Sequence, residues 1–147
     1  ERKKIGAGIL AIDKKTGDLL LGRRSMQSDN PGSWAPFGGT FETRDISTKQ
    51  TAKREFSEET GTNITYQISS SPFAVQDTPN VKFYTYVGVF DNKFQPNIDR
   101  EHISFGWFPL NSLPDNLHPG FGELIKNKKD EINNIIERTK EENETQT

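Results

Sequence analysis

The sequence contains no cysteine and only one methionine among its 147 residues. The absence of cysteine excludes a disulfide framework, a thiolate metal site and a catalytic thiol. Because a disulfide-free chain is typical of a reducing compartment, we expect a cytoplasmic protein. Any chemistry must therefore come from oxygen, nitrogen or a bound ion.

Long apolar runs and an excess of basic charge are also missing. Hydrophobic residues make up 31% of the chain, and no run approaches the roughly 20 residues of a membrane span. Lys and Arg total 19 against 21 Asp and Glu, a net charge of −2. This balance argues against a nucleic-acid partner. Small phosphorylated ligands remain open, because a bound metal can supply local positive charge.

The residue patterns predict more strands than helices. We expect helices over residues 46–60 and 121–136, each with apolar positions at helical spacing. Strands are expected at residues 5–12, 18–23, 66–68, 81–90 and 105–110, with short strands in WAPFGGTFE. The first two strands should form a hairpin that turns at Gly17. Strands mixed with helices predict an α+β fold or a three-layer α/β/α sandwich.

The length fits one domain, which we place at residues 1–136. The last stretch, ERTKEENETQT, has almost nothing to bury. Residues 137–147 are therefore expected to form a polar C-terminal tail.

The stretch REFSEETG places three carboxylates on one turn of the first expected helix. Glu55, Glu58 and Glu59 lie on one helix side, beside an apolar stripe formed by Ala52 and Phe56. Like charges at this spacing repel each other. The cluster therefore needs a compensating cation or full solvation.

Two interpretations of the cluster remain open from its residues alone. It is either a solvated acidic face balanced by Lys53 and Arg54, or a divalent-cation site. Mg²⁺ prefers carboxylate oxygens and keeps several waters for phosphate-bearing substrates. The surrounding sequence favours the second interpretation.

Residues 38–61, GGTFETRDISTKQTAKREFSEETG, resemble the Nudix box, G-x5-E-x7-R-E-U-x-E-E-x-G-U, in which U is a bulky apolar residue. The matching positions are Gly39, Arg54, Glu55, Phe56, Glu58, Glu59 and Gly61. The chain departs from the pattern at Asp45, which stands at the first Glu position. Eight residues rather than seven then precede Arg54, and Thr62 occupies the final U position.

The resemblance implies a mixed β-sheet with flanking helices and a hydrolase dependent on Mg²⁺ or Mn²⁺. Such enzymes cleave a pyrophosphate bond in a nucleoside diphosphate linked to another moiety. The implied metal ligands are Glu55, Glu58, Glu59 and a backbone carbonyl of Gly38 or Gly39. Glu55 and Glu58 thereby take part in catalysis, and Arg54 and Asp45 support the site.

A further acid is expected ahead of the late Trp107, as a base or a ligand. Glu101 is the candidate by resemblance, and Asp99 is the second choice. Arg23 and Arg24 end a strand and should face opposite sides, so that one of them reaches substrate phosphate.

Aromatic side chains complete the expected substrate site. The candidates to stack on a base are Trp34, Phe37, Phe83 and Tyr84, and any one of them is also a plausible core residue. The substrate is expected to be a nucleotide-type small molecule: an NTP, a dinucleoside polyphosphate or a nucleotide sugar. The sequence does not choose among these, and it leaves a homodimer open.

Three competing functions are less well supported. A catalytically silent nucleotide-sensing module with a Nudix fold is the main alternative, although all three helix glutamates and Arg54 are present. A Nudix-type isomerase would need a reactive cysteine, which the chain lacks. An unrelated interaction protein with an acidic helix leaves the Gly38–Gly39 turn unexplained.

Overall fold

The computed structural model describes residues 3–145. The chain forms an eight-stranded sheet with two α-helices and one short 3-10 helix within that range. The strands are β1 (Lys4–Asp13), β2 (Leu19–Arg24), β3 (Trp34–Ala35), β4 (Phe37–Thr40), β5 (Gln67–Ile68), β6 (Ala74–Asp77), β7 (Val81–Phe90) and β8 (His102–Phe108). The helices are α1 (Thr48–Thr60), η1 (Leu110–Ser112) and α2 (Pro119–Thr145).

β1 is the central strand of the sheet, and its two edges are used differently. One edge pairs in parallel with β7 along the whole strand, from Lys4 opposite Val81 to Asp13 opposite Phe90. The other edge is shared by two antiparallel strands, β2 near the end of β1 and β4 near its beginning. This sharing places the two glycines of β4 directly against the middle of β1, where Gly38 is opposite Gly8.

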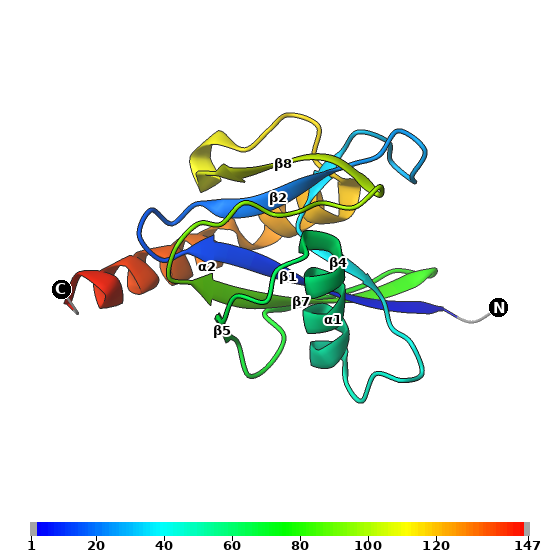
Figure 1. The fold of residues 1–147 in the computed structure, drawn as a ribbon, viewed down its shortest axis with the longest axis horizontal. Helices are drawn as coiled ribbons and strands as arrows, with labels where there is room; N and C mark the ends of the chain where they lie inside the picture. Colours follow the sequence, from blue (N-terminus) through cyan, green and yellow to red (C-terminus); the bar gives the residue numbers. More distant parts are fainter. Residues whose placement is uncertain (1–2, 146–147) are drawn as a thin grey trace.

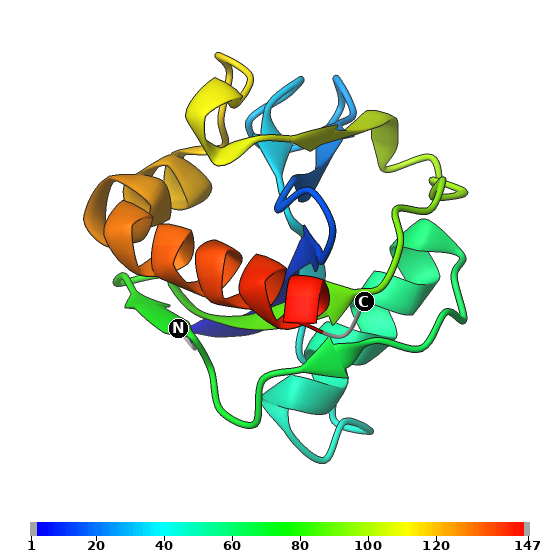
Figure 2. The same cartoon turned by 90° about the vertical axis from the view of Figure 1, so that its left-hand side faces the viewer.

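The helices cover opposite faces of this sheet, as expected for strands whose successive side chains alternate. In Figure 1, α1 lies in front of β1 and α2 passes behind it; Figure 2 shows the same separation from the side. Ile9 and Ala11 face α1, whereas Leu10 and Ile12 face α2. The mixed sheet with flanking helices is therefore confirmed.

Aromatic packing holds α1 against the sheet. Phe56 of α1 is buried and meets Phe37 edge to face, with ring centroids 6.1 Å apart. It also contacts the rings of Tyr66, Phe90 and Phe94. Burying one such side chain contributes about 1.5–3 kcal/mol. Phe56 thereby fixes the position of its neighbour Glu55 relative to the sheet.

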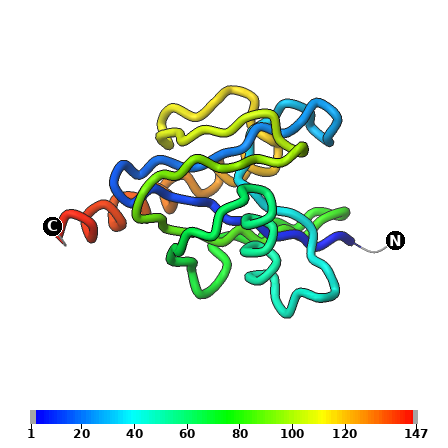
Figure 3. Tube along the Cα trace, viewed as in Figure 1, coloured from blue at the N-terminus to red at the C-terminus, as the bar shows by residue number. Residues whose placement is uncertain are grey.

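The second helix runs further than the sequence suggests. We expected it to end at residue 136, but α2 continues to Thr145 with a kink at Lys128, and it finishes at the far end of the molecule from the start of β1 (Figure 3). Its later part has a partner, because Ile136 and Lys140 lie against Gly17 in the β1–β2 turn. Residues 137–145, expected to form a polar tail, are therefore helical, and residues 146–147 lie outside the described range.

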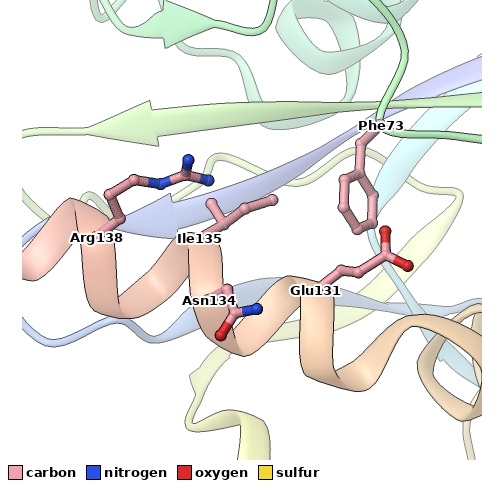
Figure 4. A pocket seen from close by; sticks show the side chains of 5 residues that line it. All are labelled: Phe73, Glu131, Asn134, Ile135 and Arg138. Carbon is pink, nitrogen blue, oxygen red and sulfur yellow. The ribbon is translucent and has the colours of Figure 1, made fainter.

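A shallow cavity of about 460 Å³ lies on the α2 face of the sheet. Figure 4 shows its lining, Phe73, Glu131, Asn134, Ile135 and Arg138. Phe73 and Ile135 pack on the apolar cluster beneath α2. The cavity is therefore on the opposite side of the sheet from α1 and its carboxylates.

Candidate active site

The helix that carries the three glutamates has defined ends. Ser47 is its N-cap and accepts a hydrogen bond from the Gln50 backbone N–H at 3.1 Å. The Gln50 side chain reaches back to the backbone N–H of Ile46 at 2.6 Å, one residue before the cap. Gly61 ends the helix in the left-handed conformation that glycine tolerates best, with φ of 66°.

The three carboxylates occupy different environments although they share one helix side. Glu59 is only 5% exposed, and its Oε1 accepts the Gly38 backbone N–H at 2.9 Å. The Glu55 side chain is 16% exposed, and its carboxyl group would overlap a Cβ on Gly39. Glu58 is 50% exposed. The glycine pair therefore lets the strand backbone approach two of the carboxylates.

Burial and mutual repulsion raise the pKa of the two inner carboxyl groups. The pKa of Glu59 rises to about 9, first because the group is buried and then because Glu55, Asp99 and Glu101 are negative. Burial also raises the pKa of Glu55, against the lowering effect of Arg54. Strongly raised values at one site are typical of functional positions. A bound cation would relieve both the repulsion and the desolvation.

Arg54 and Asp45 form the support beneath the carboxylates. The guanidinium of Arg54 donates from Nε and Nη2 to the two oxygens of Asp45, at 2.9 and 3.0 Å. Asp45 also accepts from the Thr51 hydroxyl and the Glu42 backbone N–H, both at 2.9 Å. The Arg54 guanidinium accordingly holds the pKa of Asp45 well below its usual range. Asp thus makes a two-pronged contact with Arg54 despite the longer loop.

The same guanidinium orders two of the glutamates. Nη1 of Arg54 lies 3.2 Å from Glu55 and 3.3 Å from both oxygens of Glu58. Nη2 also donates to the Thr40 carbonyl at 3.0 Å. Arg54 therefore ties α1, the loop before it and the end of β4 together.

The structure brings the acids before β8 close to this cluster. Glu101 and Asp99 both contribute to the raised pKa of Glu59. Asp99 is already engaged, since its Oδ1 accepts the Glu101 backbone N–H at 3.0 Å and lies 3.2 Å from His102 Nδ1. The Glu101 carboxylate makes no hydrogen bond within residues 3–145.

Four of the side chains expected to contact the substrate have partners of their own within the fold. Nε of Arg23 donates to the Gly32 carbonyl and Nε of Arg24 to the Asp29 carbonyl, so both arginines hold the loop that follows β2. Trp34 is half-buried against Phe108. Phe37 is fully buried in the core beneath α1, where no substrate ring can reach it.

Two features of the site were not anticipated from the sequence. The Phe83 ring lies over Gly6 and Gly8, which only residues without a side chain permit. Arg44 contacts Glu42 and Glu58 from the loop before α1. The alternating glycines of IGAGI could have predicted the close approach of a ring to β1. The position of Arg44 between Glu42 and Asp45 could have predicted its ion pair.

Within the described range, no group of three His, Cys, Asp or Glu side chains is already arranged around a common cation position. Glu55 and Glu58 instead form ion pairs with arginines: Glu55 with Arg54, and Glu58 with both Arg54 and Arg44. The oxygen donors and raised pKa values nevertheless suit a hard divalent ion.

The pattern of the NUDIX domain matches residues 2–128, most of the chain. The chain belongs to the Nudix family. Membership makes it a pyrophosphohydrolase that acts on nucleoside diphosphate derivatives. No curated protein matches the sequence.

Solved Nudix structures share the fold. The Nudix hydrolase RenU from M. smegmatis is 21% identical over 88% of this chain and 86% of its own, with a TM-score of 0.72. The NUDIX domain of Shewanella oneidensis NrtR, complexed with ADP ribose, is 17% identical over 90% of both chains, with a TM-score of 0.69.

A third structure is a bifunctional NMN adenylyltransferase/ADP ribose pyrophosphatase from Francisella tularensis, complexed with AMP and a Mn ion. It is 19% identical over 90% of this chain and 42% of its own, with a TM-score of 0.68. Among residues 3–145, no helix is long and apolar enough to cross a membrane.

Proposed function

We propose that this protein hydrolyses the pyrophosphate bond of a nucleotide derivative with Mg²⁺ or Mn²⁺ held by Glu55, Glu58 and Glu59. A backbone carbonyl of Gly38 or Gly39 would complete the protein's ligands. The observation that carries the proposal is the buried Glu59 carboxyl group, hydrogen-bonded to Gly38 beside Glu55 and with a pKa raised to about 9. A carboxylate at that position is costly unless a cation joins it.

A divalent cation bound there would offset the negative charge of the substrate phosphates and of the leaving oxygen. The protein's own part is to hold the ligands in place. Arg54 does so through its two-pronged contact with Asp45, which a lysine could not reproduce. Phe56 does so by fixing α1 on the sheet.

Glu101 is the proposed general base. Its carboxylate is near Glu55 and Glu59 and has no hydrogen-bond partner within residues 3–145. It would take the proton of a water whose oxygen attacks phosphorus as the anhydride P–O bond breaks. The leaving phosphate carries away the electron pair of that bond.

Arg23, Arg24 and Trp34 are proposed to contact the substrate, because they border the loop between β2 and β3. The arginines use only Nε to hold this loop, so their Nη atoms make no hydrogen bond to the described residues. Phe37 is not retained, because it is fully buried. AMP and ADP ribose bind the two solved relatives named above, which makes adenine nucleotides the first substrates to test.

The test is a phosphate-release panel with Mg²⁺ or Mn²⁺ that contains ATP, dATP, a diadenosine polyphosphate and ADP-ribose. Wild type should turn over at least one of them, and Glu58→Gln should lose about 100-fold or more of that rate. Glu137→Gln is the matched control, because Glu137 is exposed on α2 and far along the chain from the site. Unchanged turnover in Glu58→Gln would contradict the metal site. Nucleotide binding by wild type without turnover would favour a sensing module.

A further inference from the structure

Arg44 forms ion pairs with two exposed glutamates at the edge of the site, Glu42 and Glu58. It lies in the loop between β4 and α1, which bulges out beside the helix in Figure 3. Its Nε donates to Glu42 Oε1 at 2.8 Å, and its Nη2 lies 3.3 Å from Glu58 Oε1. Arg44 therefore bridges a loop carboxylate and a helix carboxylate. Arg54 reaches the same two groups, with Nη1 3.6 Å from Glu42 and 3.3 Å from Glu58.

The two arginines around Glu58 differ in how firmly they are held. Arg54 is 14% exposed and anchored by Asp45 and the Thr40 carbonyl. Arg44 is 64% exposed, and its partners Glu42 and Glu58 are themselves about half exposed. Exposed ion pairs contribute little to stability, because water screens them and two long side chains must be ordered. Of the two arginines, Arg44 is thus the one that can leave Glu58 more easily.

We propose that Arg44 is a built-in competitor for the divalent cation, occupying Glu42 and Glu58 until the ion displaces it. This inference rests on the proposed metal site at Glu55, Glu58 and Glu59. A cation approaching Glu58 meets a carboxylate already paired with a guanidinium, and it must break that pair to bind. Arg44 thereby weakens metal affinity and, once released, leaves a free guanidinium beside a phosphate-bearing substrate.

The other cations near α1 do not share this position. Lys53 is exposed on the same helix and forms no ion pair within residues 3–145. Lys49 and Lys53 instead line an open cleft with Ile46, Ser47, Gln50 and Arg54. Lys53 therefore provides a matched control: its neutralisation changes the net charge equally without touching Glu58.

The experiment is a calorimetric titration of the full chain with Mn²⁺ alone, at constant ionic strength and without nucleotide. Arg44→Gln should bind Mn²⁺ about two- to fivefold more tightly than wild type, the range expected when an exposed ion pair no longer competes. Lys53→Gln should match wild type. The gain should vanish in the Glu58→Gln background, because the carboxylate for which Arg44 competes is then neutral.

The outcomes separate this inference from the proposed function. Equal Mn²⁺ affinity in wild type and Arg44→Gln would overturn the competition while leaving the metal site intact. An equal gain in Lys53→Gln would also overturn it, because the effect would then be general electrostatics. Absence of Mn²⁺ binding in every variant would overturn the metal site and the competition together. Thermal unfolding of each metal-free variant confirms that it is folded.

Discussion

The Glu59 carboxylate accepts the backbone N–H of Gly38 at 2.9 Å, which joins the last turn of α1 to the strand that borders β1. This bond crosses 21 residues of sequence. It explains why a glutamate only 5% exposed stays in place although its neighbours are negative. This bond holds helix α1 and strand β4 together at the carboxylate cluster.

Neutralising Glu59 should change how stability depends on pH. The pKa of Glu59 in the folded protein, about 9, lies above the 4.5 of an unperturbed glutamate, so the metal-free folded state binds one more proton than the unfolded state between these values. Stability from this group is full below about pH 4.5 and is lost as pH rises toward 9. Relative to Glu59→Gln, the unfolding free energy of wild type should therefore fall by up to about 1.4 kcal/mol per pH unit in this window.

Chemical denaturation of both proteins from pH 5 to 9, with a chelator present, measures this difference. Gln at position 59 can still accept the Gly38 N–H, so the backbone contact is preserved. Parallel pH profiles for the two proteins would mean that Glu59 is not protonated in the fold.

The two glycines of strand β4, Gly38 and Gly39, should respond differently to alanine. A Cβ on Gly39 would overlap the Glu55 carboxyl group, which can swing away. A Cβ on Gly38 would lie 2.6 Å from the Ala7 carbonyl oxygen, which cannot. We expect Gly39→Ala to stay folded and lose at least about tenfold in activity, the effect of about 1.4 kcal/mol in the barrier. Gly38→Ala should lose thermal stability.

Melting temperatures and rates measured on the two variants check this contrast. A Gly39→Ala protein with wild-type turnover would show that Glu55 is not needed where it stands.

Asp45→Asn should weaken the fold most at neutral pH. Because Arg54 lowers the folded pKa of Asp45, its carboxylate stabilises the protein above the unfolded value of about 3.8 and loses this effect as pH falls below it. The difference in melting temperature between wild type and Asp45→Asn should therefore shrink in acid. Thr51→Val removes one donor to the same carboxylate and should cost about 1 kcal/mol.

Thermal scans at pH 7 and pH 3 provide the comparison. A difference that is constant across that range would indicate that the Asn variant harms packing rather than charge pairing.

Glu101→Gln should separate catalysis from binding. Loss of a general base lowers the rate by about 10²–10⁴-fold, and the Mn²⁺ affinity should stay close to that of wild type. Asp99→Asn is the comparison, because Asp99 is committed to the Glu101 N–H and His102. If Asp99→Asn abolishes turnover and Glu101→Gln does not, the base is Asp99.

Much of the site was predictable because its signals are local. The helix and its carboxylate side follow from short-range patterns, and α1 ends at Thr60 as expected. The turn expected at Gly38–Gly39 was wrong, because both glycines lie within strand β4 and pair with β1. β7 also has the expected bounds, since aromatic and β-branched residues mark it throughout. β1 and β2 form the expected hairpin around Gly17, whose φ is 80°.

The parts that were missed depend on contacts between distant segments. β6 was not expected, because this four-residue strand exists only by pairing with β7. The last turns of α2 carry few apolar residues, and their partner is the Gly17 turn more than 100 positions earlier. Phe37 is an aromatic residue that could stack on a base, and the sequence does not show that α1 packs over it and buries it in the core.

The most direct test of the account is proton release when the metal binds. Wild type should be titrated with Mn²⁺ at pH 7 in two buffers of different ionisation enthalpy. Because the Glu59 pKa of about 9 keeps this group protonated before binding, the account predicts release of about one proton per site, lost in Glu59→Gln. Mn²⁺ binding without proton release, or release that persists in Glu59→Gln, would contradict a cation site built on the buried carboxyl group of Glu59.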